Sequence, residues 1–116
     1  MIALLLLALA PANPNCANPP TQVDMNDCAL VEFNKADSKL NAQWKLTYRS
    51  FKDDSDESAA RLRAAQRAWI AYRDAQCDAE HWFDLGVSLD HGLNIMCRTG
   101  LTEERTSQLK RLAQDN

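Results

Sequence analysis

The spacing of mainly apolar side chains predicts a helix in the second half of the chain. Between residues 57 and 83 they recur every three or four positions, which places them on one helical face. That face consists of Leu62, Ala65, Trp69, Tyr72 and Gln76. Further alanines favour helix, and neither glycine nor proline interrupts the run. We therefore predict a central helix over 57–83, with Trp69 and Tyr72 as its large apolar anchor.

A longer stripe of the same kind precedes this segment. Thr21, with Asp24 three residues further on, has the pattern of a helix N-cap with a box-like partner. The three-to-four spacing then continues for about thirty residues, which corresponds to a helix roughly 45 Å long. Its apolar face comprises Met25, Cys28, Ala29, Phe33, Ala36, Leu40, Trp44, Tyr48 and Phe51.

The last third of the chain returns to helical spacing over residues 91–112. Gly92 and Gly100 weaken this helix, and a break at Gly100 would let Thr102 start a separate segment. Polar turns separate the three helical stretches. The economical assembly is an all-α fold, a small antiparallel three-helix bundle in an up-down-up arrangement.

Four acidic residues crowd the first turn: Asp53, Asp54, Asp56 and Glu57. A calcium loop is one interpretation, but the alternating oxygen ligands, the glycine and the distal glutamate of an EF-hand are lacking. A charged turn that caps the next helix and complements its dipole fits the sequence better. Because these charges should be exposed, they are also our candidate partner-facing residues.

The N-terminus has the character of a targeting segment. Residues 2–10 form an apolar run that is too short to span a bilayer, and Ala10-Pro11-Ala12 supplies a small-x-small cleavage pattern. We predict a signal peptide over 1–12 and a single helical domain over 13–116. The basic leader is missing, which suggests a start further upstream. A buried N-terminal helix is the alternative, and the prolines that follow disfavour it. We expect an exported protein, periplasmic or secreted.

The chain has four cysteines: Cys16, Cys28, Cys77 and Cys97. In an exported chain of this size they predict two disulfides. A zinc site is the competing interpretation, but structural zinc prefers tight Cys-x-x-Cys spacing. In the predicted bundle the three helical cysteines share one end, so geometry leaves all three connectivities open.

Composition and motifs narrow the functional class. A chain of 116 residues with a net charge of −3 has room for one domain, and it lacks a basic patch for nucleic acid. No pairing of a nucleophile with a base is apparent. His81 and His91 flank a loop with Asp84 and Asp90 that could hold a metal, but this spacing is not a ligand motif. We therefore predict a binding protein without cofactor, metal or enzymatic activity.

Charged and aromatic side chains leave a further choice. Arg67, Arg73 and Asp74 form either a recognition patch or an ion-pair set that holds the second helix against its neighbours, and we favour the ion-pair set. The three tryptophans raise the same choice, and we expect each in the core: Trp44, Trp69 and Trp82.

The central segment resembles the signature of the lysozyme inhibitor LprI family of small bacterial envelope proteins. Its pattern is Gln-x-Ala-Trp-x-x-Tyr-Arg-Asp-x-x-Cys, from Gln66 to Cys77. The early cysteine pair, the late cysteine and the run Leu-Thr-Glu-Glu-Arg-Thr at 101–106 agree in order, so the resemblance spans roughly residues 16–112. Together with sequence locality, it favours the pairs Cys16–Cys28 and Cys77–Cys97.

The resemblance also implies a function. It indicates a non-catalytic binding protein that inhibits a c-type lysozyme, with either the acidic turn or the 84–91 loop in the enzyme's cleft. The alternative is a structural or accessory envelope module that binds another protein and has no lysozyme activity.

Overall fold

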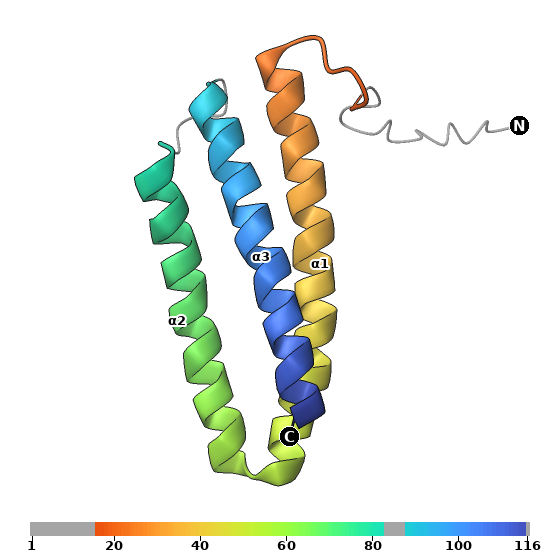
Figure 1. Cartoon of the computed structure of the whole chain (residues 1–116), viewed down its shortest axis with the longest axis vertical. Coiled ribbons are helices and arrows are strands. Elements are labelled where there is room, and N and C mark those ends of the chain that lie inside the picture. The colour runs from red at the N-terminus through yellow and green to blue at the C-terminus, as the bar shows by residue number, and fades with distance from the viewer. Residues whose placement is uncertain (1–15, 83–87, 116) are drawn as a thin grey trace, which may run out of the picture.

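The part of the chain that the structure describes forms three long helices (Figure 1). A computed structural model describes residues 16–82 and 88–115, and the helices within it are α1 (Gln22–Asp54), α2 (Asp56–Glu80) and α3 (Leu89–Asp115). The described part contains no strand, which confirms the predicted all-α class and helix count. The predicted signal peptide lies outside the described residues.

Polar caps set the helix ends. The hydroxyl of Thr21 accepts the backbone N–H of Asp24 at 3.1 Å and donates to its carboxylate at 2.7 Å, so the predicted N-cap is confirmed. Ser55 alone separates α1 from α2 in an extended conformation. Its N–H donates to the carbonyl of Phe51 and its hydroxyl accepts the N–H of Ser58. The chain therefore reverses within one residue, and both helices extend into the expected turn.

The apolar core lies in the half of the bundle nearest the Ser55 turn. Each helix contributes one buried leucine: Leu40, Leu62 and Leu109. Partly buried aromatic rings close around these leucines: Trp44, Tyr48, Phe51 and Trp69. Trp44 and Trp69 therefore have the core positions expected of them. Trp82 does not, because it lies beyond the end of α2 and is 72% exposed.

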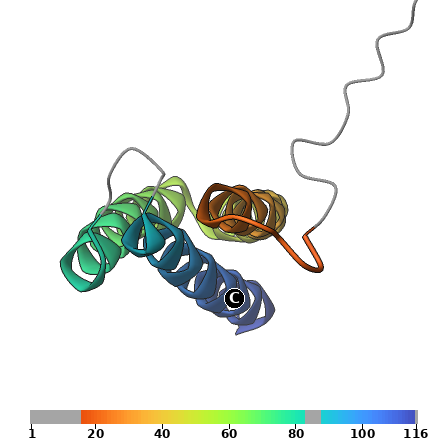
Figure 2. The same ribbon diagram turned by 90° about the horizontal axis from the view of Figure 1, so that it is seen from above.

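Helices α1 and α3 run in the same direction and make the most extensive helix–helix contact (Figure 2). Buried Asn26 of α1 donates to the carbonyl of Ser88 at 2.9 Å. Its other amide atom, Oδ1, would lie only 2.2 Å from a Cβ at Gly92. A side chain at Gly92 would therefore displace the Asn26 amide, which reaches from α1 to the first turn of α3.

Gly100 has no such role and does not interrupt α3. The helix continues through it, so the alternative of a second segment starting at Thr102 is wrong. A Cβ at Gly100 would find no atom within 4 Å. Backbone hydrogen bonds on either side carry the helix across a residue of low helix propensity.

The buried face of α2 differs from the predicted one. Tyr72 is 55% exposed and Ala65 is exposed, whereas Gln66 and Arg73, one position further along the chain in each case, are buried. A one-residue offset corresponds to a rotation of about 100° about the helix axis. The predicted apolar face is therefore wrong at Ala65 and Tyr72, whereas Leu62 and Trp69 contact the core as predicted.

Candidate functional site

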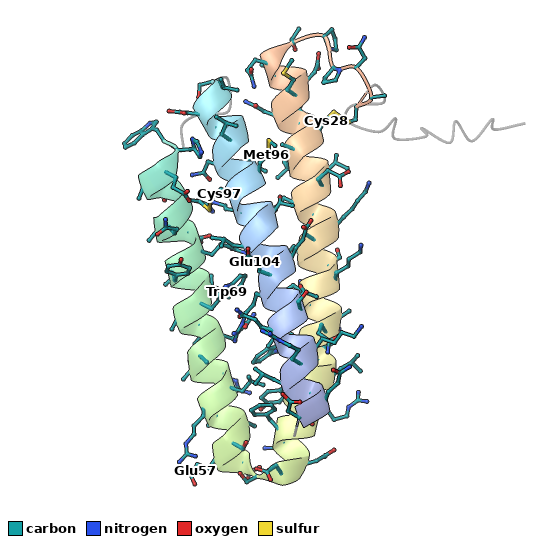
Figure 3. All side chains as sticks on the ribbon, in the orientation of Figure 1. Cys28, Glu57, Trp69, Met96, Cys97 and Glu104 are labelled. Atoms are coloured by element: carbon teal, nitrogen blue, oxygen red, sulfur yellow. A yellow bond between two sulfur atoms is a disulfide. The ribbon has the colours of Figure 1, made fainter. Side chains whose placement is uncertain are left out.

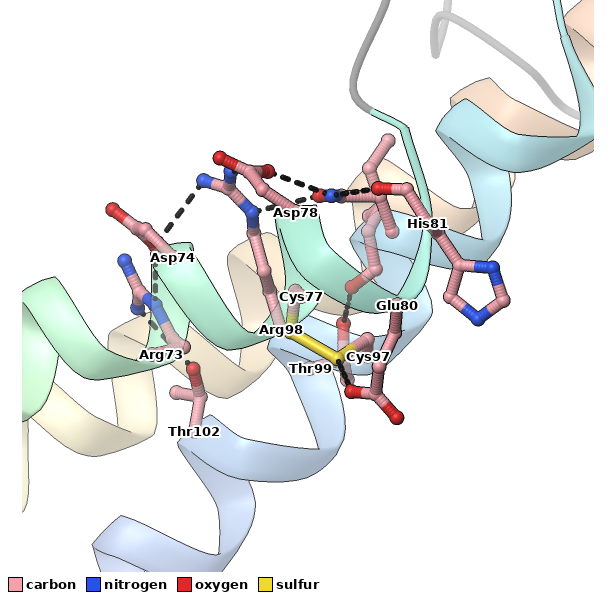
Figure 4. The surroundings of a disulfide bond; sticks show 12 residues. Arg73, Asp74, Cys77, Asp78, Glu80, His81, Cys97, Arg98, Thr99 and Thr102 are labelled. Atoms are coloured by element: carbon pink, nitrogen blue, oxygen red, sulfur yellow. Dashed lines mark hydrogen bonds and ion pairs between the residues drawn. A yellow bond between two sulfur atoms is a disulfide. The ribbon is translucent and has the colours of Figure 1, made fainter.

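Two disulfides lie in the half of the bundle away from the Ser55 turn. They join Cys16 to Cys28 and Cys77 to Cys97, with Cα–Cα distances of 5.5 and 5.7 Å. This is the connectivity favoured by locality and by the family resemblance. The first bond ties the residues before α1 to that helix, and the second ties α2 to α3 (Figure 4).

A polar network surrounds the second disulfide (Figure 4). The fully buried amide of Asn94 donates to the Asp78 carboxylate and to the His81 carbonyl, both at 2.9 Å. Its Oδ1 accepts from Nε of Arg98 at 2.8 Å, and Arg98 reaches Asp78 at 3.0 Å and Asp74 at 3.2 Å. These bonds lower the pKa of Asp78 below its ordinary value of 3.8, with the Asn94 amide as the largest cause.

Arg73 is the buried cation of the α2–α3 interface. Its Nε donates to Asp74 at 2.9 Å and its Nη1 to the Thr102 hydroxyl at 3.3 Å. The guanidinium also lies over two rings, 5.2 Å from the Trp69 centroid and 5.4 Å from that of Phe33. Arg73 thus contacts all three helices, and the ion-pair interpretation fits its surroundings better than a recognition patch. Arg67, in contrast, lies exposed on α2.

A second arginine repeats this arrangement one layer closer to the core. Nε of Arg105 donates to Oε1 of Gln66 at 2.9 Å, and its guanidinium lies 5.9 Å from the Trp69 ring centroid. Burial lowers the pKa of Arg105. Two arginine guanidiniums therefore lie close to the Trp69 ring. Most of the sequence signature therefore serves the fold, because its residues hold α2 to the neighbouring helices. These residues are Gln66, Trp69, Arg73, Asp74 and Cys77.

The acidic turn lies at the opposite end of the bundle from the disulfides, as Glu57 marks in Figure 3. All four predicted partner-facing residues are exposed. Asp56 pairs with Lys52 at 2.6 Å, which lowers the pKa of Asp56 and raises that of Lys52. Glu57 pairs with Arg61, also at 2.6 Å.

Asp53 and Asp54 differ from the other two acidic residues. Among the described residues none forms an ion pair with either carboxylate. They also lie in the last turn of α1, where the helix dipole disfavours negative charge. The ion pairs of the described residues therefore use Asp56 and Glu57, at the start of α2, but neither Asp53 nor Asp54.

The histidine loop is only partly described. Nδ1 of His81 lies 3.6 Å from the Asp90 carboxylate, and the backbone N–H of His91 donates to the Ser88 hydroxyl that caps α3. Asp84 and the rest of 84–87 lie outside the described residues. Within the described residues, the one cluster with three metal-ligand atoms is Cys77, Glu80 and Cys97, and both of its sulfurs are already bonded to each other.

No helix of the described chain combines the length and apolar character that a membrane span requires. The described residues form a small bundle of three helices tied by two disulfides. Most of the polar contacts described above hold its helices to one another. The chain matches the family described as lysozyme inhibitor LprI over residues 13–109, and it belongs to that family.

Two relatives extend this finding. An uncharacterised protein of Rhizobium meliloti (strain 1021) is 36% identical, with 96% of this chain and 91% of the relative aligned. The uncharacterised protein YecT of Escherichia coli (strain K12) is 28% identical over 80% of this chain and 67% of its own length. No solved structure matches the chain.

Proposed function

We propose that this protein is an exported, non-catalytic inhibitor that binds a c-type lysozyme through the acidic turn at Ser55. The observation that carries the proposal is membership of the LprI lysozyme inhibitor family over most of the chain. Members of a family of inhibitors act by binding rather than by catalysis. The two disulfides support an oxidising, extracytoplasmic location, periplasmic or secreted.

The turn suits this role because its charge is exposed and concentrated on a short segment. A single extended residue, Ser55, fixes the ends of α1 and α2, so four carboxylates project from a short segment. Asp53 and Asp54 can accept hydrogen bonds from a partner without giving up an existing ion pair. A negatively charged tip speeds the encounter with a basic protein.

The test compares two matched double variants. Asp53→Asn/Asp54→Asn and Asp56→Asn/Glu57→Gln each remove two negative charges at nearly constant size. Binding to hen egg-white lysozyme is measured by surface plasmon resonance at several salt concentrations, together with lysis of bacterial cells.

Both variants should lower the association rate similarly, by up to about tenfold at low salt, because both remove the same charge from the tip. Only Asp53→Asn/Asp54→Asn should also raise the dissociation rate. The reason is that Asp53 and Asp54, which form no ion pair within the described residues, are the carboxylates available to bond the enzyme. A dissociation rate unaffected by this variant would place the contact elsewhere, and the 84–91 loop would replace the turn as the candidate.

A second function is favoured by one observation. Most of the signature residues hold α2 to its neighbours. The family match therefore rests on residues that stabilise the fold rather than on residues of a binding surface. An accessory envelope module that binds another protein would keep the same signature. If the parent protein neither binds lysozyme at low salt nor slows cell lysis, the inhibitor proposal fails and this second function replaces it.

A further inference from the structure

A groove runs between α1 and α3 in the half of the bundle that carries the disulfides. Its volume is about 440 Å³. Both helices contribute residues at spacings of three and four, so the groove follows their shared direction. The lining residues that matter here are Met25, Ala29 and Glu32 of α1 and Met96, Gly100 and Glu103 of α3. Figure 3 shows Met96 on the side of α3 that faces α1.

Two exposed methionines line the groove, one from each helix. Met25 is 46% exposed and Met96 is 60% exposed, although both are apolar. Neither belongs to the core cluster of leucines and aromatic rings. Methionine side chains are flexible and polarisable, and they adapt to the shape of a bound group.

Gly100 keeps the groove open. A glycine in the middle of a helix lowers stability relative to alanine, and the packing of this fold does not require one there. A Cβ at this position would meet no atom within 4 Å, in contrast to Gly92 in the same helix. The absence of a side chain at Gly100 leaves space beside Met96 that a partner group can occupy.

Two carboxylates line the groove at the end that points toward the core. Glu32 and Glu103 each follow the small residue of their own helix, Ala29 or Gly100, by three positions. Glu32 pairs with Lys35 at 3.1 Å, but both side chains are 64% exposed, and such a pair exchanges readily. None of the ion pairs among residues 16–82 and 88–115 involves Glu103.

We propose that this groove binds a lysine or arginine side chain that projects from a protein partner. The aliphatic stem would lie along Met25, Met96 and Gly100, and the cationic head would lie between Glu32 and Glu103. Long basic side chains combine an apolar stem with a charged tip, and the groove offers the complementary surfaces in the same order. The groove is separate from the acidic turn, and the proposal does not depend on lysozyme as the partner.

The experiment follows the methionine methyl groups by NMR in protein labelled with ¹³C-methyl methionine. Met25→Leu and Met96→Leu assign the two resonances. The probe is the capped peptide acetyl-Gly-Lys-Gly-amide, and its norleucine counterpart keeps the stem but lacks the charge. We expect saturable shifts of both methyl groups with the lysine peptide and much weaker binding of the norleucine peptide.

Three variants locate the interaction, with circular dichroism to check that each is folded. Glu32→Gln/Glu103→Gln should weaken binding of the lysine peptide about fivefold or more, as expected for two partly exposed ion pairs. Gly100→Leu should abolish the shifts by filling the groove. Asp53→Asn/Asp54→Asn removes the same number of charges at the far end of the bundle and should leave binding unchanged.

Several results would overturn the proposal. Equal binding of the norleucine peptide would make the groove a purely apolar site. Equal weakening by the Asp53→Asn/Asp54→Asn control would indicate general charge attraction. Methyl shifts that depend on protein concentration without peptide would show that a second copy of the chain covers the groove. Because lysozyme is not used, none of these results bears on the proposed inhibition.

Discussion

The two glycines of α3 predict opposite responses to the same substitution. A Cβ at Gly92 would lie 2.2 Å from Oδ1 of Asn26, whereas a Cβ at Gly100 would meet no atom within 4 Å. Both positions lie within one helix, so replacement by alanine brings a gain in helix propensity of up to about 1 kcal/mol at each. The difference in unfolding free energy between the two variants therefore isolates the contact with α1.

The cost at Gly92 follows from what Asn26 would have to give up. Its amide is buried, donates to the Ser88 carbonyl at 2.9 Å and accepts from Gln22 at 2.8 Å. Moving the amide away from a new methyl group breaks these bonds, at about 1–3 kcal/mol for a buried group left unpaired. Overpacking adds about 1–3 kcal/mol. After the gain in propensity of about 1 kcal/mol, Gly92→Ala should destabilise the protein by about 1–5 kcal/mol.

Gly100→Ala should instead stabilise the protein by about 0.5–1 kcal/mol. Urea unfolding followed by circular dichroism, with the disulfides intact, gives both values, and equal m-values would show that the denatured state is unchanged. The expected difference corresponds to roughly 6–50 °C in melting temperature for a domain of this size. Equal stabilisation by both substitutions would refute the close approach of α1 and α3 at Gly92.

Three further predictions concern the α2–α3 interface. Trp69→Ala should cost about 3 kcal/mol in thermal unfolding, the low end for aromatic truncation, because the ring is only partly buried; a change below 1 kcal/mol, on the order of a surface substitution, would contradict its core role. Replacing Cys77 and Cys97 by alanine should lower the free energy of unfolding by about 3 kcal/mol, because a 20-residue loop constraint is lost. A negligible loss in denaturant titration would contradict this prediction. Asp78, whose pKa is lowered mainly by Asn94, contributes stability that is present above its ordinary value of 3.8 and is lost as the pH falls through the lower folded-state value. The melting curves of Asp78→Asn and the parent should therefore converge at acidic pH, and a constant difference across the whole range would count against this linkage.

Local sequence information was sufficient for the helices and their order. Apolar spacing of three and four residues identifies each helix. Small polar residues such as Thr21 and Ser55 mark where a helix begins, through hydrogen bonds within a single turn. The acidic turn and the exposure of its charges follow from the same reasoning. The disulfide pairing needed the family resemblance as well, because three cysteines share one end of the bundle.

The tertiary structure decided which side of α2 faces inward. Alanines occur around much of this helix, so its apolar pattern fixes the period but only loosely the phase. Arg73 is buried in place of Tyr72 because Thr102 of α3 and the ring of Phe33 of α1 satisfy its guanidinium. These partners are distant in sequence, and their contribution cannot be deduced from α2 alone.

The same reason explains the two glycines and the groove. Both glycines appear as weak points when α3 is considered by itself. The position of α1 puts the Asn26 side chain against Gly92 and leaves no room for a Cβ there. The same position leaves Gly100 open to solvent beside Met96. Helix propensity is a property of the segment, whereas the space available to a side chain depends on which helices pack against it.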